Sequence, residues 1–205
     1  VLLFVSNDLR RKNLMLVLQA MARLQDAAGA IQDEEGGRRI AAASGRAGLH
    51  LIVAGGRRSA AYRRWAHRHR LGGRVTFLPP REDIETLYGA ADIFVLPTLY
   101  DAFANACLEA MACGLPVITS ANNGAAEIID QRRHGIVLSR LDAEALAAAI
   151  TDLSPPQVRR SMGARAAGTA AALSWEKCTA ELLALYEQVQ RLKRGERRKG
   201  GANRS

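Results

Sequence analysis

The chain has 205 residues and a mass of 22.2 kDa, enough for one large domain or two small ones with a buried core. Hydrophobic residues make up 48% and charged residues 24%, a composition that excludes disorder over most of the length. No apolar run is long enough to span a bilayer, and no signal peptide opens the chain. Because the chain starts at Val1 and its first residues already have the pattern of a strand, we expect a fragment or a processed piece.

The net charge of +9 is unevenly distributed. Residues 191–205 hold seven basic residues and one acidic residue, which leaves +3 for the other 190 residues. We therefore expect residues 191–205 to form a disordered basic tail. Two interpretations of this tail stay open: a frayed, solvated terminus, or a segment attracted to an acidic membrane surface.

The cysteines point to no metal or redox motif. Cys107, Cys113 and Cys178 are an odd number, at spacings that match neither zinc sites nor redox pairs. They are predicted to be buried thiols in a reducing compartment.

Apolar runs and helical periodicity alternate along the chain. Residues 26–48 are rich in alanine, glycine and charge, and we expect a loop insertion there. Strands are predicted at 1–6, 49–54, 75–78, 93–96, 117–119 and 136–138. Helices are predicted from about residue 14, at 59–71, 83–90, 105–113, near Glu127, and at 142–153, 156–173 and 175–192.

This order of elements predicts an α/β fold. Each expected strand is a continuous apolar run, as in a parallel sheet that helices cover on both faces. We expect a doubly wound parallel sheet with extra helices at the C-terminal end. In such a sheet the ligand lies beyond the carboxyl ends of the strands, so the loops after the strands should carry the functional residues.

The loop after the first strand is basic. Arg10, Arg11 and Lys12 precede a helix whose N-terminus itself favours negative charge. A bound phosphate between these side chains and the backbone amides would remove that conflict. The alternative is a solvated basic turn.

Two carboxylates flank the next candidate site. Asp101 lies in the loop after the fourth strand, and Glu109 lies one turn into the following helix. Carboxylates accept hydrogen bonds from sugar hydroxyls, while backbone amides at a helix start bind phosphate. Alternatively, Asp101 is a turn residue and Glu109 a surface charge.

Other polar residues are less informative. Pro79-Pro80 stiffens a loop that leaves Arg81 at its edge, and Asn122-Asn123-Gly124 is predicted to be a flexible turn without specificity. The histidines His67, His69 and His134 are expected to be structural or at the surface. The sequence contains no dinucleotide fingerprint, P-loop, zinc-protease motif or nucleophile elbow. A nucleotide sugar is the ligand that fits these cations and carboxylates.

Five separated motifs then occur in the order and spacing of one enzyme family. They are Arg11-Lys12, residues 91–97 (ADIFVLP), residues 101–118 (DAFANACLEAMACGLPVI), residues 123–127 (NGAAE) and Ser174-Trp175. The third resembles the E-x7-E signature of retaining GT-B glycosyltransferases of family 4 (glycosyl transferases group 1), with Asp101 where the family usually has Glu. The resemblance runs from residue 1 to about residue 186. Residues 6–12 and 77–92 look most like lipopolysaccharide core glucosyltransferases.

The resemblance implies a role for each matched residue. Arg11 and Lys12 would stabilise the leaving diphosphate, and Asp101 would accept hydrogen bonds from the donor sugar. Glu109 would bind the ribose. Further contacts would come from Phe103, Ala104 and Asn105 to sugar and phosphate, and from Pro80 and Arg81 to the nucleobase. No metal and no other cofactor is implied.

The resemblance also implies a domain organisation. Residues 1–190 would be the donor-binding domain, with 26–48 an insertion and 191–205 the tail. The acceptor, a glycan or a lipid-linked molecule, would bind through an N-terminal domain that this chain lacks, so the chain alone would bind donor without turning it over. We expect a cytoplasmic location, peripheral at the inner face of the cell membrane through the tail.

Two alternative functions compete with this interpretation. One is a nucleotide-sugar epimerase on the same fold, which relies on other carboxylates and histidines. The other is a basic nucleic-acid-binding module, against which the terminal charge and the 5% of aromatic residues count. We therefore expect no nucleic-acid partner.

Overall fold

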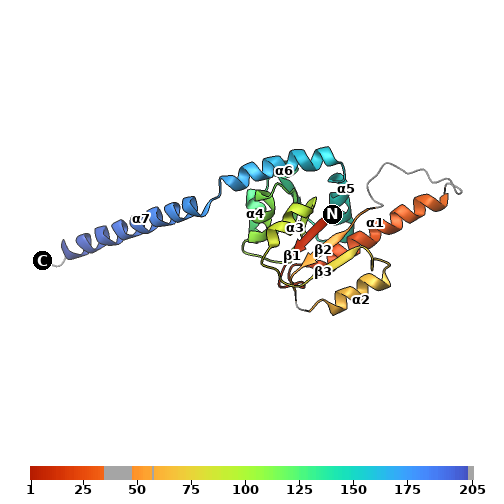
Figure 1. Ribbon diagram of the computed structural model, residues 1–205. Helices are drawn as coiled ribbons and strands as arrows, with labels where there is room; N and C mark the ends of the chain where they lie inside the picture. Colours follow the sequence, from red (N-terminus) through yellow and green to blue (C-terminus); the bar gives the residue numbers. More distant parts are fainter. Residues whose placement is uncertain (35–47, 57, 203–205) are drawn as a thin grey trace. The chain divides into compact units, whose positions relative to one another are not determined.

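The computed structural model describes residues 1–34, 48–56 and 58–202 (Figure 1). They form two compact units, one over Val1–Thr169 and one from Ala170 onward. No helix among the described residues is both long enough and apolar enough to cross a membrane.

The first unit is built on a six-stranded parallel sheet with the order β3-β2-β1-β4-β5-β6. Leu2 in the central strand β1 pairs with Leu51 on one side and Ile93 on the other. The prediction of a doubly wound parallel sheet is confirmed. The strands are β1 (Leu2–Val5), β2 (Leu51–Ala54), β3 (Val75–Leu78), β4 (Ile93–Leu96), β5 (Val117–Ser120) and β6 (Gly135–Leu138).

Helices cover both faces of this sheet. The chain runs from β1 to β3 in one direction and from β4 to β6 in the other, so right-handed crossovers place α1 and α2 on one face and α3 and α4 on the opposite face. Helix α1 also packs against α5. The helices of this unit are α1 (Leu14–Glu34), α2 (Ala60–Arg68), α3 (Ile84–Ala90), α4 (Asn105–Ala112), the 3₁₀ helix η1 (Gly124–Ile128), α5 (Ala143–Asp152) and α6 (Pro156–Ala171).

The strand order places one pair of loops side by side. Strands β1 and β4 are neighbours, yet the chain leaves them toward opposite edges of the sheet. This is the topological switch point, where open α/β sheets leave a crevice at the carboxyl ends of the strands. The loops after β1 and β4, which carry the predicted cations and Asp101, therefore meet at this point.

The structure differs from the sequence prediction in two segments. Helix α1 continues to Glu34, so residues 26–34 are helical and not part of a loop insertion; residues 35–47 lie outside the described part. Helix α7 (Trp175–Ala202) continues through residues 191–202, where a disordered tail was expected, and residues 203–205 are not described. Alanine in the first segment and arginine, lysine and glutamate in the second are strong helix formers, which accounts for both differences.

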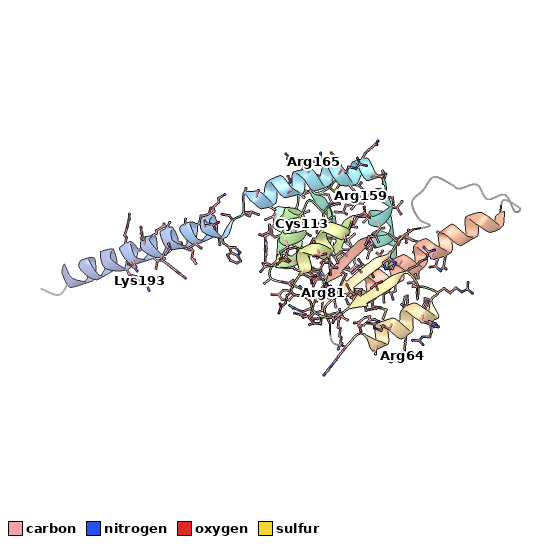
Figure 2. All side chains as sticks on the ribbon, in the orientation of Figure 1. Arg64, Arg81, Cys113, Arg159, Arg165 and Lys193 are labelled. Carbon is pink, nitrogen blue, oxygen red and sulfur yellow. The ribbon has the colours of Figure 1, made fainter. Side chains whose placement is uncertain are left out.

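The cysteine prediction holds only in part. Cys107 is buried, whereas Cys113 and Cys178 are exposed. Cys113 lies at the end of α4, where the chain turns toward β5 (Figure 2).

Helix α6 contacts the rest of the unit through the hydrogen bonds and ion pair of one side chain and through close backbone packing at a glycine. Arg159 donates hydrogen bonds to the carbonyl oxygens of Leu153 and Ser154, and its guanidinium lies 3.4 Å from Asp92 (Figure 2). At Gly163 a Cβ atom would lie 2.0 Å from the carbonyl oxygen of Gly114, whereas at Gly168 it would meet nothing within 4 Å.

We predict that Gly163→Ala destabilises the protein and that Gly168→Ala does not. The first change forces α6 away from the Gly114 turn, at a cost of about 1–3 kcal/mol. The second adds helix propensity in open space and should stabilise by up to about 1 kcal/mol. Thermal unfolding of both variants measures the difference, and equal melting temperatures would contradict this close packing.

Candidate functional site

Buried polar residues gather at one edge of the sheet. Of the seven buried polar or charged residues among those described, only His134 lies elsewhere. It is structural, as predicted: its Nδ1 accepts from the Asp130 amide, and its Nε2 lies 3.1 Å from Thr169 Oγ1. The other six follow or end strands β1, β4 and β5: Ser6, Lys12, Thr98, Thr119, Ser120 and Asn123. This is the edge at which the fold predicts a ligand.

The β1–α1 loop is a tight, internally bonded turn. The Asp8 amide donates to Ser6 Oγ over 2.9 Å, and the Arg11 amide donates to Asp8 Oδ1 over 3.0 Å. That second hydrogen bond lowers the pKa of Asp8 below its ordinary value. Asn13 has a φ of 60°, which lets the chain turn into α1. The turn fixes the direction in which Arg11 and Lys12 leave the backbone.

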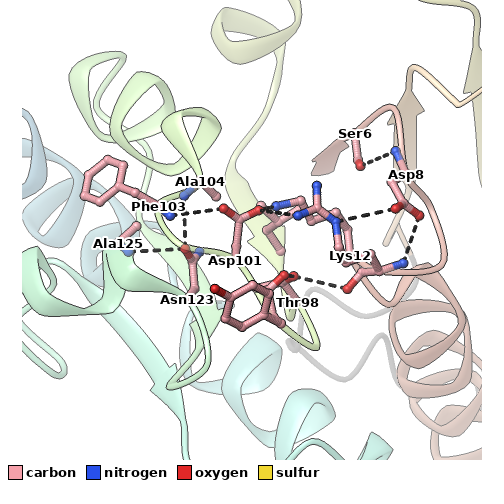
Figure 3. Close-up of polar contacts among 12 residues, drawn as sticks. Ser6, Asp8, Lys12, Thr98, Asp101, Phe103, Ala104, Asn123 and Ala125 are labelled. Atoms are coloured by element: carbon pink, nitrogen blue, oxygen red, sulfur yellow. Dashed lines mark hydrogen bonds and ion pairs between the residues drawn. The ribbon is translucent and has the colours of Figure 1, made fainter.

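Lys12 and Arg11 converge on Asp101 (Figure 3). Lys12, with 7% of its surface exposed, forms an ion pair with Asp101 Oδ2, and Arg11 Nη1 lies 3.8 Å from the same oxygen. Burial, with a smaller effect of the Arg11 cation, lowers the pKa of Lys12. Lys12 and Asp101, which are 89 positions apart in the sequence and lie in different loops, are thus in contact in the structure.

The β4–α4 loop is tied to the β1–α1 loop through the backbone. The Leu99 amide donates to the carbonyl oxygen of Arg11 over 2.9 Å. Thr98 Oγ1 lies 3.1 Å from the same carbonyl oxygen and 3.0 Å from that of Tyr100 (Figure 3). The position of Asp101 relative to the cations is therefore set by hydrogen bonds that do not involve its own carboxylate.

Asn123 holds the other side of this loop, which the sequence analysis missed. Its side chain is 1% exposed, and its Oδ1 accepts from the amides of Ala104 at 3.1 Å and Ala125 at 3.2 Å. Its Nδ2 donates to Thr119 Oγ1 over 2.9 Å. The sequence predicted a flexible turn without specificity here, whereas the structure shows a turn held in place by Asn123. The Asn123 side chain is buried, so it cannot replace these hydrogen bonds with hydrogen bonds to water. We call this arrangement the Asn123 clamp.

Backbone contacts complete the clamp. The Asp101 amide donates to the carbonyl oxygen of Asn122, and the Gly124 amide donates to that of Asp101, each over 3.0 Å. A Cβ atom at Gly124 would lie 1.8 Å from the carbonyl oxygen of Ala102, so only glycine fits. The Asn-Gly pair was the sequence signal that could have shown this close approach.

The amides at the start of α4 are only partly available to a ligand. The Phe103 amide donates to Asp101 Oδ1 over 3.1 Å, and the Ala104 amide is bound by Asn123. Within the described part of the chain, the amides of Asn105 and Ala106 donate no hydrogen bond. The helix therefore presents Asn105 and Ala106, rather than Phe103 and Ala104, as free backbone donors.

Glu109 lies on the exposed side of α4 and is held from α3. Tyr88, 1% exposed, donates its hydroxyl proton to Glu109 Oε2 over 2.8 Å. Burial and this hydrogen bond raise the pKa of Tyr88, so its hydroxyl remains a donor. The sequence analysis did not identify Tyr88, because a separation of 21 positions between Tyr88 and Glu109 gives no sign that the two side chains are in contact.

Pro80 and Arg81 lie apart from this junction. Both are exposed in the loop after β3, the edge strand of the sheet. Arg81 is held by Asp83 through two hydrogen bonds of 2.7 and 2.5 Å. Among the described residues, no hydrogen bond or ion pair joins either of them to Asp101 or Glu109.

The site's own counter-charges for an anion are Arg11 and Lys12. Among the described residues, no group of three or more His, Cys, Asp or Glu could hold a metal ion. What the junction offers is two cations, two carboxylates and the free amides at the start of α4.

A scan against family models matches residues 1–169 to glycosyl transferases group 1. The chain belongs to this family. Among curated relatives, the D-inositol 3-phosphate glycosyltransferase of Mycolicibacterium paratuberculosis is 33% identical over 165 residues, which are 76% of this chain and 37% of that protein. The enzyme of the same name from Salinispora tropica is 32% identical over 150 residues, 69% of this chain and 31% of that protein. The chain thus spans about a third of the length of these family members.

Solved structures of glycosyltransferases share the fold. Sucrose-phosphate synthase from Thermosynechococcus elongatus is 29% identical with a TM-score of 0.72, over 93% of this chain and 46% of that one. WaaG, a glycosyltransferase involved in lipopolysaccharide biosynthesis, is 24% identical with a TM-score of 0.70, over 84% and 43%. Anabaena HepE, solved with UDP and glucose, is 20% identical with a TM-score of 0.71, over 89% and 47%. The family member described here therefore has the fold of the C-terminal domain of GT-B glycosyltransferases.

We predict that Asn123→Ala destabilises the domain by about 2–4 kcal/mol, because the buried amides of Ala104 and Ala125 lose their acceptor. Asn122→Ala removes a neighbouring exposed side chain and should change stability by less than about 0.5 kcal/mol. Chemical denaturation of the two variants makes the comparison. A stable Asn123→Ala protein would show that the loop is not clamped by this side chain.

Proposed function

We propose that this chain is the donor-binding domain of a retaining glycosyltransferase of family 4 that uses a nucleotide sugar, a UDP-sugar by preference. The domain would span residues 1–190, beyond the 1–169 matched by the family model. The observation that carries the proposal is the convergence of Lys12 and Arg11 on Asp101 at the switch point of the sheet.

The electrostatics of this junction favour a diphosphate. Lys12 is the only lysine, arginine, aspartate or glutamate among the described residues that is buried, and burial makes its charge costly, as its lowered pKa indicates. One carboxylate, Asp101, faces both Lys12 and Arg11. Arg11 Nε also lies 3.4 Å from Asp8 Oδ2, so the two cations have two carboxylate neighbours. A diphosphate would take the place of Asp101 beside Lys12 and Arg11, Asp101 would turn to the sugar, and the free amides of Asn105 and Ala106 at the start of α4 would add hydrogen bonds.

The carboxylates support a sugar on one side and a ribose on the other. Asp101 would accept hydrogen bonds from hydroxyls of the donor sugar, next to the diphosphate. Glu109, oriented by Tyr88, would accept from the ribose hydroxyls. We further propose that Phe103 and Ala104 shape the sugar site, and that Pro80 and Arg81 flank the nucleobase.

The mechanism follows from these positions. When the bond between the anomeric carbon and the diphosphate oxygen breaks, negative charge develops on the leaving group. Arg11 and Lys12, which the loop holds next to Asp101, would stabilise that charge once Asp101 has turned to the sugar. The acceptor hydroxyl would attack the anomeric carbon from the face that the diphosphate leaves, and its proton would pass to the departing diphosphate oxygen, so that the configuration at the anomeric carbon is retained.

The acceptor would bind outside this chain. Since the chain spans about a third of its relatives, we propose that it binds donor alone without turning it over. A glycan or lipid-linked acceptor, and a role in lipopolysaccharide or cell-envelope polysaccharide synthesis at the cytoplasmic face of the membrane, accord with the similarity to WaaG. The cations of residues 191–202, which lie on helix α7, would favour an anionic membrane there.

We predict that the two carboxylate variants separate the nucleotide from the sugar. Glu109→Gln should weaken binding of UDP by about ten- to a hundredfold, the cost of a lost charged hydrogen bond. Asp101→Asn should leave UDP binding unchanged or tighter, since it releases Lys12 and Arg11 from their carboxylate, but should weaken binding of UDP-glucose. Calorimetric titration with both ligands measures these affinities.

The matched control for this titration is Glu144→Gln, which removes an exposed carboxylate on α5. Its affinities should equal those of the unmodified chain. If Asp101→Asn weakened UDP binding as much as Glu109→Gln, the assignment of sugar and ribose would be wrong. If neither variant changed either affinity, the donor site would lie elsewhere.

A further inference from the structure

Helix α2 presents a row of arginines to solvent. From residue 36 to residue 81 the sequence contains no aspartate or glutamate, so the small net charge outside residues 191–205 conceals a strongly basic stretch. The described exposed arginines of α2 and its flanks are Arg58, Arg63, Arg64, Arg68 and Arg70. Arg64 points away from the body of the domain, on the outer side of α2 (Figure 2).

These arginines differ from most others in the first unit because none pairs with a described carboxylate. Seven other described arginines of this unit are ion-paired, as in the pairs Arg132–Asp152 and Arg140–Asp142, both at 3.0 Å. Arg10, Arg74, Arg160 and Arg165 form no ion pair with a described carboxylate either, but they lie apart from one another in the sequence. Arg63, on the same helix, is occupied in another way: it donates to the carbonyl oxygen of Phe77 and lies 4.6 Å above that ring. The ion pairs of the described residues are otherwise those of Val1, Arg11, Lys12, Arg23, Arg81, Arg133, Arg159 and Arg191.

The remaining side chains of α2 limit the kind of partner. Ala66 faces the sheet and is buried, and the ring of Trp65 is stacked on that of His69 at 3.8 Å. One face of the Trp65 ring is therefore already occupied, which leaves α2 little aromatic surface for stacking on the bases of a single-stranded nucleic acid. What remains outward is a set of exposed guanidinium groups, which suits an anionic surface more than a stacking groove.

We propose that the outer face of α2 binds the surface of a bilayer that contains anionic lipids. Guanidinium groups bind phosphate and carboxylate headgroups with paired hydrogen bonds, and each basic residue near such a surface adds to the attraction. This proposal does not rest on the donor site, and it concerns a surface separate from residues 191–205.

The segment before α2 packs on the loop that carries Arg11 and Lys12, so a bilayer bound to α2 would lie near that loop. Gly55 and Gly56, which lead from β2 toward α2, fit closely against Ser6 and Leu9: a Cβ atom on either glycine would come within 2.5 Å of those residues. The start of α2 is thus connected to the loop that carries Arg11 and Lys12. A bilayer bound along α2 would hold this edge of the sheet close to the membrane surface.

The test is vesicle co-sedimentation of the full chain, with phosphatidylcholine vesicles that either contain or lack phosphatidylglycerol. The variant is Arg58→Gln, Arg64→Gln, Arg68→Gln and Arg70→Gln combined. Its matched control removes the same charge from exposed arginines elsewhere: Arg23→Gln, Arg132→Gln, Arg133→Gln and Arg140→Gln. We expect the α2 variant to bind anionic vesicles at least roughly tenfold more weakly than the control.

Equal vesicle binding by the α2 variant and the control would overturn the proposal, and so would equal binding of the unmodified chain to both kinds of vesicle. Binding of a single-stranded RNA is measured in parallel. A loss of RNA binding by the α2 variant, with its vesicle binding intact, would also overturn the proposal. The last result would identify a nucleic-acid surface. Circular dichroism and thermal melting establish that each variant is folded. Should the fourfold variant fail to fold, Arg64→Glu with Arg68→Glu replaces it and must show the same loss.

Discussion

A buried ion pair between two loops organises this domain. Lys12, after β1, and Asp101, after β4, are far apart in the sequence and meet because the strand order makes β1 and β4 neighbours. Burying a lysine costs free energy unless a carboxylate or another anion compensates its charge. The place of the diphosphate in the proposed function depends on this contact, which backbone hydrogen bonds between the two loops bring about.

A second set of residues holds that pair in position without touching the proposed ligand. Thr98 and Leu99 bind the backbone of the β1–α1 loop, and Asn123 binds the amides on either side of the β4–α4 loop. Burial raises the pKa of the Cys107 thiol to about 12, so beside Asn123 this cysteine remains neutral and acts as a packing residue. The two loops that carry the charged side chains of Lys12, Arg11 and Asp101 are therefore held in place by hydrogen bonds.

The sequence predicted the sheet well, because continuous apolar runs fully buried in a parallel sheet leave a clear pattern. The bounds of β3 and β4 agree with the expectation to the residue. The rule that ligands lie at the carboxyl ends of strands also singled out Arg11, Lys12 and Asp101, which the structure brings together where β1 and β4 end. The helical residues 26–34 and 191–202 were missed, since glycine and charge obscured the periodicity of segments with good helix formers.

Contacts between distant residues were beyond sequence analysis. The hydrogen bonds of Asn123 and Tyr88 depend on which loops and helices the fold brings together, and no local pattern encodes them. The net charge of the sequence has the same limit, because it counts ion-paired and unpaired arginines alike. Only the structure separates the paired arginines from the unpaired ones on and beside α2.

The most direct test of the central claim is a crystal structure of the chain with a bound UDP-sugar. The account predicts diphosphate oxygens at about 3 Å from Lys12 Nζ and from the Arg11 guanidinium, with Asp101 turned to the sugar hydroxyls. A diphosphate bound away from the β1–β4 switch point, with the Lys12–Asp101 pair undisturbed, would contradict it.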